Sequence, residues 1–77
     1  MEQHWQMISD NGGWLKPATV VLSTVKMPEI KGIDLGYRYE SCLFTKGDSE
    51  VLARYDTVAD AVLGHRNLST DYDLTER

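Results

Sequence analysis

The sequence predicts a small α+β domain in which one C-terminal helix packs on a three-stranded antiparallel sheet, in the order βββα. Two observations carry this prediction. Three segments at 18–27, 37–46 and 50–56 are rich in Val, Thr and aromatic residues and alternate with the period of a strand. They are followed at 57–68 by a capped segment with apolar side chains at helical spacing. A chain of 77 residues is long enough for one such domain, spanning 1–77.

The first predicted strand is apolar on both faces. Between Ala18 and Met27, Val, Leu and Thr alternate with Val and Ser, a pattern that fits the centre of a sheet. Pro17 has no backbone N–H to donate, so we expect the strand to begin after it. The following residues 28–36 contain one Pro and two Gly and predict a loop. This loop is longer than the usual hairpin connection of about two to five residues.

The second and third predicted strands form a hairpin. The segments 37–46 and 50–56 are separated only by Gly, Asp and Ser, so we expect them to pair antiparallel. On the paired strands we expect Arg38, Glu40 and Arg54 to share a face as cross-strand charge pairs, a structural group. The alternative is a site for an anionic ligand held by the forked donors of arginine.

The predicted helix begins at Thr57, a good N-cap, with Asp60 three residues later as the acid of a capping box. Gly64 lowers helix stability by about 1 kcal/mol relative to Ala, which indicates an early end of the helix or a close backbone contact. The apolar face of this helix includes a histidine. It consists of Val58, Ala61, Val62 and His65, with Leu68 at its edge.

The two ends of the chain carry weaker signals. Residues 1–13 are polar with scattered large side chains and end in Asn-Gly-Gly, which predicts a short helical turn or an N-terminal arm. Residues 69–77 are polar and acidic and predict a frayed tail. One short helix covers only one of two apolar sheet faces. We therefore expect the other face to support a homodimer or small oligomer, or to contact a partner.

Charge and cysteine content exclude several classes of protein. Twelve acidic against eight basic side chains give a net charge of -4, which argues against direct nucleic-acid binding. Cys42 is the only cysteine and, with His4 and His65, makes no familiar zinc set, so we predict no metal and no cofactor. The sequence has no apolar run of about 20 residues and no basic, apolar leader, which predicts a cytoplasmic protein outside the membrane.

His65 admits two interpretations. It is a general base or a ligand, or it packs on the sheet and bonds a polar strand residue such as Glu40 or Arg54. The second is favoured, because no nucleophile or carboxylate cluster accompanies the histidine. The sequence also lacks paired carboxylates, a glycine-rich phosphate loop and a Ser-His-Asp arrangement, so we predict that the protein is not an enzyme.

Two stretches carry a resemblance to other sequences. VVLSTVKM followed by YRYESCLF resembles the pattern STV, loop, F/Y-E-T-x-V/L-F, and EVLARYDTVADAVLGH resembles R-Y-x-T-x-x-E-A-x-x-G-H. Over residues 20–66 the chain is therefore similar to a family of small proteins encoded by tailed bacteriophages and prophages. The matching positions are Ser23, Thr24, Val25, Glu40, Phe44, Thr57, Ala61, Gly64 and His65.

The chain departs from this family pattern in two places. Lys26, Met27 and Pro28 occupy the position where relatives carry a Gly-Leu-Asp-His-like stretch, and Ser41 replaces the usual Thr. The family has no assigned activity, so the resemblance implies an origin rather than a mechanism. Small acidic phage proteins without catalytic motifs often act by binding a host protein, as inhibitors of CRISPR and other immune systems do.

These features predict a phage-encoded accessory protein that inhibits a host immune or regulatory protein, of the anti-CRISPR kind, through a surface contact. The predicted contact residues are Trp14, Glu29, Asp34, Tyr37 and Tyr39. One alternative is an oligomeric sponge for a cyclic-nucleotide immune signal. The residues predicted to bind that signal are Arg38, Arg54, His65 and Arg66. A further alternative is a virion or assembly component.

Overall fold

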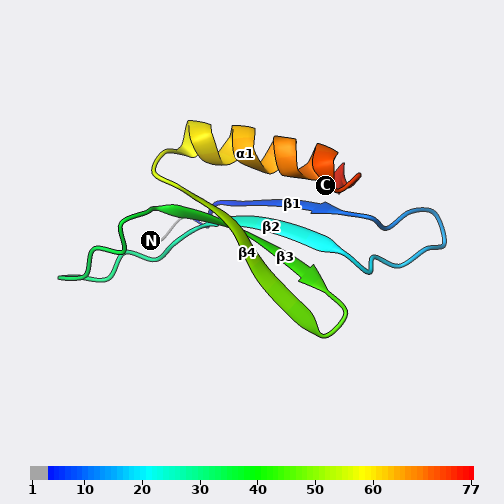
Figure 1. Ribbon diagram of the computed structural model, residues 1–77, viewed down its shortest axis with the longest axis horizontal. Coiled ribbons are helices and arrows are strands. Elements are labelled where there is room, and N and C mark those ends of the chain that lie inside the picture. Colours follow the sequence, from blue (N-terminus) through cyan, green and yellow to red (C-terminus); the bar gives the residue numbers. More distant parts are fainter. Residues whose placement is uncertain (1–3) are drawn as a thin grey trace.

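The computed structural model describes residues 4–77 as one antiparallel sheet with a helix along one of its faces (Figure 1). The five strands follow the order β4-β3-β2-β1-β5, and each neighbouring pair is antiparallel. The elements in chain order are β1 (Gln6–Asp10), β2 (Val21–Lys26), β3 (Tyr39–Thr45), β4 (Asp48–Tyr55), α1 (Val58–Asp71) and β5 (Thr75–Glu76).

The predicted class, one helix packed on an antiparallel sheet, is confirmed, but the sheet has five strands where we predicted three. Both additional strands come from the chain ends. β1 lies within 1–13, where we predicted a helical turn or an arm, and β5 lies within 69–77, where we predicted a frayed tail. Their sequences, QMISD and TE, are largely polar. Pairing of β1 with both β2 and β5 supplies the stability that local strand preference does not.

The predicted hairpin is confirmed and is tighter than expected. β3 and β4 are joined by a two-residue turn, in which Gly47 takes a φ of 77°, a conformation open to glycine without strain. The pairing register then shifts between Ser41 and Cys42, so that Leu52 is an additional residue in β4. This bulge bends the outer strand of the sheet and interrupts its regular edge.

The helix also begins as predicted. The hydroxyl oxygen of Thr57 accepts a hydrogen bond of 3.1 Å from the backbone N–H of Asp60. Ala61 and His65, from the predicted inner face, are fully buried. Val58, from the same predicted face and in the first turn of α1, is 45% exposed.

Polar side chains fill most of the space between the sheet and α1. Leu22, Leu43 and Ala61 are the buried apolar side chains among residues 4–77. The buried polar side chains on this side of the sheet are Ser9, Thr24, Ser41, His65 and Ser69. A core with so few apolar groups depends on hydrogen bonds to satisfy what it buries.

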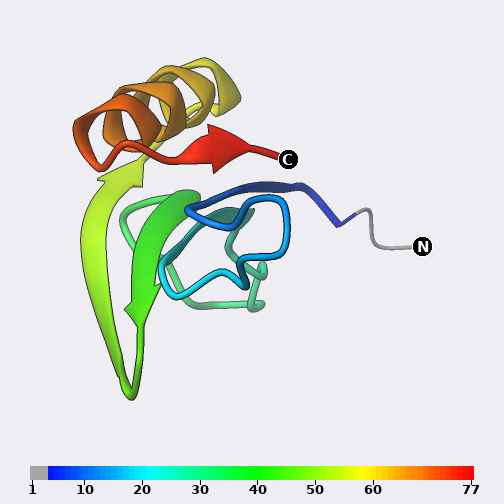
Figure 2. The same ribbon diagram turned by 90° about the vertical axis from the view of Figure 1, so that its right-hand side faces the viewer.

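The second face of the sheet is not covered by any helix among residues 4–77 (Figure 2). Phe44 and Val51 on this face are 44% and 45% exposed. Ser23, near the centre, receives a hydrogen bond from the Gln6 carboxamide. This agrees with the expectation that a single helix leaves one sheet face open.

The molecule is elongated, with extents of 46 × 24 × 24 Å. The loop between β1 and β2 (11–20) and the loop between β2 and β3 (27–38) project at opposite ends of the long axis (Figure 1). Each loop contains a small antiparallel bridge of its own, Gly13 with Lys16 and Ile30 with Ile33. These two loops therefore project beyond the sheet and the helix that pack together in the core.

Candidate functional site

A line of hydrogen-bonded side chains, which we call the polar chain, crosses the molecule beneath α1. Its members come from the helix and from β1, β2, β3 and β4, so the line ties these elements together. In order they are Ser69, Ser9, His65, Thr24, Ser41 and Tyr55. No buried side-chain nitrogen or oxygen in the described part of the chain lacks a hydrogen-bond partner. The polar chain thereby offsets the cost of removing these groups from water.

His65 is the centre of the polar chain and has no exposed surface. Its Nε2 lies 2.8 Å from the Ser9 hydroxyl and its Nδ1 lies 2.6 Å from the Thr24 hydroxyl. A neutral imidazole donates at one nitrogen and accepts at the other, so it fits between two hydroxyl groups. Burial lowers the pKa of His65 from its ordinary value of 6.5, although the charge of Glu76 acts in the opposite direction. The side chain is therefore neutral at pH 7.

The predicted partners of His65, Glu40 or Arg54, are wrong. These two side chains lie opposite each other in β3 and β4, where the Arg54 Nε donates to Glu40 at 3.1 Å. Because side chains alternate along a strand, the next residue in β3, Ser41, is the one that faces the helix. Of the predicted charge group, the cross-strand pair of Glu40 and Arg54 is confirmed and lies on the uncovered face, whereas Arg38 pairs with Glu29 instead.

Gly64 brings α1 close to the sheet. A Cβ atom at this position would overlap the ring of Tyr55, whose hydroxyl bonds Ser41 at the end of the polar chain. The helix continues beyond Gly64 to Asp71, so the predicted close contact is confirmed and the predicted early end is wrong. The glycine allows an aromatic ring to lie against the helix backbone while its hydroxyl stays hydrogen bonded.

The β1–β2 loop ends in a tight turn that exposes two apolar side chains. Gly13 and Lys16 exchange backbone hydrogen bonds of 3.0 Å in both directions, which leaves Trp14 and Leu15 between them. Trp14 is 92% exposed and Leu15 is 91% exposed. Leu15 has a φ of 61°, a left-handed conformation that costs a residue with a side chain about 1–2 kcal/mol. We call Trp14 and Leu15 the tip.

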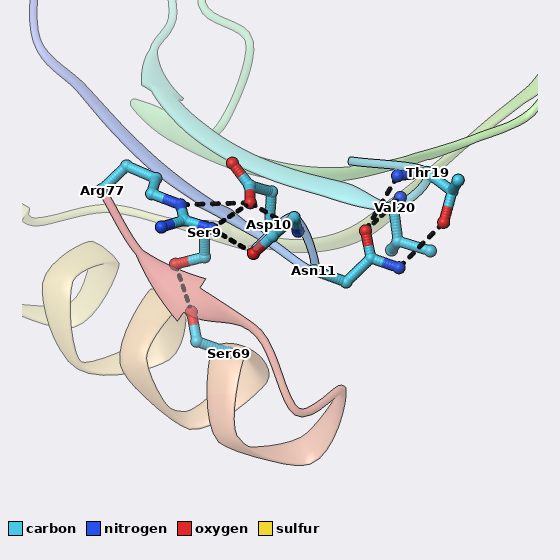
Figure 3. Close-up of polar contacts among 8 residues, drawn as sticks. Ser9, Asp10, Asn11, Thr19, Val20, Ser69 and Arg77 are labelled. Carbon is cyan, nitrogen blue, oxygen red and sulfur yellow. Dashed lines mark hydrogen bonds and ion pairs between the residues drawn. The ribbon is translucent and has the colours of Figure 1, made fainter. Parts of the chain in front are cut away.

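Side-chain hydrogen bonds fix the base of this loop (Figure 3). The carboxamide oxygen of Asn11 accepts the backbone N–H groups of Thr19 and Val20 at 2.8 and 2.9 Å. On the other side Arg77 donates to the carboxylate of Asp10 at 2.7 and 3.1 Å. The hydrogen bonds from Arg77 lower the pKa of Asp10, so the carboxylate stays charged. The tip is therefore carried on a loop anchored to both β1 and the C-terminal strand.

At the opposite end of the molecule the β2–β3 loop surrounds an open hollow of about 490 Å³. Residues 26–30, 33–38 and Asp56 line it, and we call it the hollow. Its volume lies within the range of about 300–1,000 Å³ that is typical of binding pockets. Most lining residues come from the β2–β3 loop, and the others are Lys26 at the end of β2 and Asp56 between β4 and α1. The hollow therefore lies at the end of the sheet.

Apolar side chains surround the hollow without entering the core. The backbone N–H of Ile33 donates to the carbonyl oxygen of Ile30 at 3.0 Å, which closes a turn containing Gly32 at a φ of 83°. Ile30, Ile33 and Leu35 are 49%, 57% and 39% exposed. Three neighbouring aliphatic side chains thus remain in contact with water at one end of the protein.

The structure brings together three of the five predicted contact residues. Glu29, Asp34 and Tyr37 line the hollow. Trp14 lies in the tip, at the other end of the molecule. Tyr39 packs against the edge of Trp5, with 5.2 Å between ring centroids. Their binding of a partner stays a prediction.

The four residues predicted for the nucleotide alternative do not meet. Each of the three arginines is paired with a different glutamate. The pairs are Arg38–Glu29 at 3.8 Å, Arg54–Glu40 at 3.1 Å and Arg66–Glu76 at 3.8 Å. Arg54 also lies over the ring of Tyr37, at 4.5 Å from its centroid, while His65 is enclosed beneath the helix. These donors do not form one anion site.

The carboxylate of Glu40 and the thiol of Cys42 are neighbours on the uncovered face, with 3.2 Å between sulfur and oxygen. Burial alone would raise the pKa of Glu40, but hydrogen bonds from Cys42, Arg54 and Tyr37 outweigh burial and lower it. Burial and the adjacent carboxylate raise the pKa of the Cys42 thiol. The thiol is therefore protonated at neutral pH and is a poor nucleophile.

Within residues 4–77, no three His, Cys, Asp or Glu side chains are grouped so that they could hold a metal ion. No helix in the same range has the length and apolar character needed to cross a bilayer. Comparison of the chain with protein-family models, with curated proteins and with solved structures found no match. The arrangement of its own side chains is therefore what indicates a function.

The predicted contact residues did not include Leu15, Ile30, Ile33 and Leu35, the exposed apolar side chains of the two loops. A usable signal lies in the segments GGWLK and EIKGI, in which large apolar side chains occupy positions typical of tight turns. A turn of this kind projects from the sheet and has no core to enter. Apolar residues placed there are thus candidates for contact with another molecule.

Proposed function

We propose that this chain is a phage-encoded accessory protein that binds a host immune or regulatory protein, of the CRISPR type or similar, and blocks its surface. The site of action is the host cytoplasm. The phage origin rests on the resemblance over residues 20–66. The observation that carries the binding role is the hollow, with Ile30, Ile33 and Leu35 exposed around it.

The composition of the hollow supports a protein partner. The exposed Ile30 and Ile33 supply apolar surface to its lining, and Glu29, Asp34 and Arg38 supply charged groups to the same lining. Protein interfaces likewise combine apolar contacts with charged and polar groups. A hollow of about 490 Å³ is large enough to receive one aromatic or aliphatic anchor side chain of a partner.

The turn geometry supports the same conclusion. Ile33 lies in a turn closed by a backbone hydrogen bond to Ile30, so the backbone that carries its exposed side chain is held in a defined position. A loop whose backbone is ordered before binding loses less conformational entropy when a partner covers it. Because Ile33 is 57% exposed, its apolar surface contributes little to folding and remains free to contribute to binding.

The test is capture of host proteins from a bacterial lysate by the tagged protein, with native mass spectrometry of the eluate. We compare the wild type with Ile33→Asp and with Leu63→Asp as a matched control, since Leu63 is 61% exposed on α1. We expect one host protein to be retained by the wild type and the control and to be lost with Ile33→Asp. Purified partner should then bind Ile33→Asp at least about tenfold more weakly.

Three results would contradict the proposal. Equal retention by Ile33→Asp and the wild type would remove the hollow as the contact surface. Absence of any host protein from the wild-type eluate would argue against the inhibitor role. Added mass of nucleotide size on the wild type would favour the cyclic-nucleotide sponge instead. Circular dichroism of each variant checks that the fold is retained.

A further inference from the structure

We propose that the tip of one copy of this protein docks in the hollow of a second copy. This inference shares the hollow with the proposed function and names a second occupant for it. The tip consists of Trp14 and Leu15, and Ile30 and Ile33 are the apolar contacts offered by the hollow. When no host partner is present, the protein is its own ligand.

The tip has the properties of a preformed anchor. Its two side chains are exposed by 92% and 91%, the highest values among the exposed apolar residues of the described chain. The turn is closed by backbone hydrogen bonds in both directions between Gly13 and Lys16. Within this turn the Leu15 backbone has a left-handed conformation, which is unfavourable for a residue with a side chain. Tryptophan is among the residues that dominate interface energies, because it buries a large area with few rotatable bonds.

The hollow complements the tip in both polarity and charge. Ile30 and Ile33 in its lining offer exposed apolar surface to the two apolar side chains of the tip. Among its lining residues the charged side chains are Glu29, Asp34, Asp56, Lys26 and Arg38, three acids against two bases, for a net charge of -1. Glu29 and Arg38 are already paired, at 3.8 Å. Lys16, next to the tip, brings the opposite charge to this surface.

The position of the two features requires two molecules. The tip and the hollow lie at opposite ends of a molecule 46 Å long, so no copy can reach its own hollow. Two copies side by side and antiparallel would exchange two such contacts, and copies in a row would repeat one. Both assemblies contain the same contact between tip and hollow. The experiment therefore measures the strength of this contact, whichever assembly forms.

Two variants separate the halves of the contact. Trp14→Ser with Leu15→Gly removes the tip, and glycine suits the φ of 61° at that position. Ile33→Asp places a charge in the hollow and leaves the turn backbone unchanged. Leu63→Asp again serves as the control, because Leu63 is equally apolar and 61% exposed but belongs to neither surface. Sedimentation velocity on a dilution series of each purified protein gives the self-association constant.

We expect the wild type and Leu63→Asp to self-associate, and each of the other two variants to weaken self-association by at least about thirtyfold. Mixing the tip variant with the hollow variant should produce a 1:1 heterodimer, since each supplies the half that the other lacks. A wild type that stays monomeric up to high micromolar concentration would overturn the inference. So would a tip variant that associates like the wild type, or a mixture without heterodimer.

This experiment uses purified protein alone and is independent of host capture. Self-association with complementation but no host partner would keep the inference and remove the proposed function. A host protein lost with Ile33→Asp, from a chain that is strictly monomeric, would do the reverse.

Discussion

Beneath α1 most of the buried side chains are polar, whereas the two loop ends expose large apolar side chains. Most small proteins show the reverse distribution. Beneath the helix, serine, threonine and histidine are fully buried, and three apolar side chains accompany them. At the loop ends, tryptophan, leucine and isoleucine lie in water. Single exposed apolar residues are common on any protein surface. A polar interior combined with apolar turns is uncommon, because a chain with apolar side chains in the interior and polar ones in the turns would bury more apolar area.

This difference indicates which residues serve the fold and which serve another purpose. The polar chain is complete, with both nitrogens of His65 bonded, so it stabilises one arrangement of helix and strands. The tip and the rim of the hollow contribute little to that arrangement. Residues that oppose the needs of folding are where functional constraint is expected. This argument supports our proposal that the loop ends are the sites of contact, and it favours a structural role for the histidine.

The largest expected effect comes from breaking the polar chain. His65→Ala leaves a cavity and deprives the buried hydroxyls of Ser9 and Thr24 of a partner. We expect the free energy of unfolding to fall by about 3 kcal/mol and Tm by about 15 °C. Chemical and thermal denaturation followed by circular dichroism measure both. Partner binding by the folded fraction should be unchanged.

Leu63→Ala is the control for this change, because it also shortens a side chain on α1 but at a position 61% exposed. Its effect should stay within about 0.5 kcal/mol. If His65→Ala were as mild as the control, the polar chain would not stabilise the fold. If it impaired binding more than stability, His65 would become a site residue.

A smaller effect is expected from pH. Burial lowers the pKa of His65 below the 6.5 of the unfolded chain, so the unfolded state binds a proton that the folded state refuses. Stability is therefore fully present above about pH 6.5 and declines as pH falls from there to the folded pKa. The decline amounts to about 1.4 kcal/mol for each pH unit between the two values.

Asp10 and Glu40 also have lowered pKa values, but their ordinary values of 3.8 and 4.5 place their effect at more acidic pH. Urea unfolding of the wild type and of His65→Gln at pH 7 and pH 5.5 isolates the histidine contribution. The difference between the two pH values should shrink in the variant. An identical pH dependence in both proteins would mean that His65 titrates normally despite its burial.

The sequence predicted the parts of this fold that have local signals. Thr57 begins the helix through its side-chain oxygen, and the two-residue turn at Gly47 has an ordinary hairpin chemistry. β1 and β5 carry no such signal, because their stability comes from pairing with residues far away in the chain, such as Arg77 with Ile8. The partners of His65 were mispredicted for a related reason. Which strand residue faces the helix depends on the register, and a shift of one position exchanges Glu40 for Ser41.

The candidate site was predicted only in part. Glu29, Asp34 and Tyr37 do line one hollow. They could be predicted because a long loop with turn residues indicates an exposed surface. The separation of Trp14 from these residues could not be predicted with β1 unrecognised. β1 forms a hairpin with β2, and the loop of this hairpin places the tip at the far end of the sheet.

The smallest expected effect is the sharpest test of the loop ends, because it should have the opposite sign for folding and for contact. Leu15→Gly relieves a left-handed residue at a φ of 61°, while the additional freedom of glycine in the unfolded chain offsets part of the gain. We expect the free energy of unfolding to rise by about 0.5 kcal/mol while self-association weakens. Asp73→Gly is the matched control, since Asp73 also has a positive φ, of 55°, but follows α1 and is not part of the tip. It should affect stability similarly and leave self-association unchanged. If Leu15→Gly instead destabilised the protein by more than about 1 kcal/mol, Leu15 would be serving the fold, and the distinction between a structural interior and functional ends would fail at its most exposed residue.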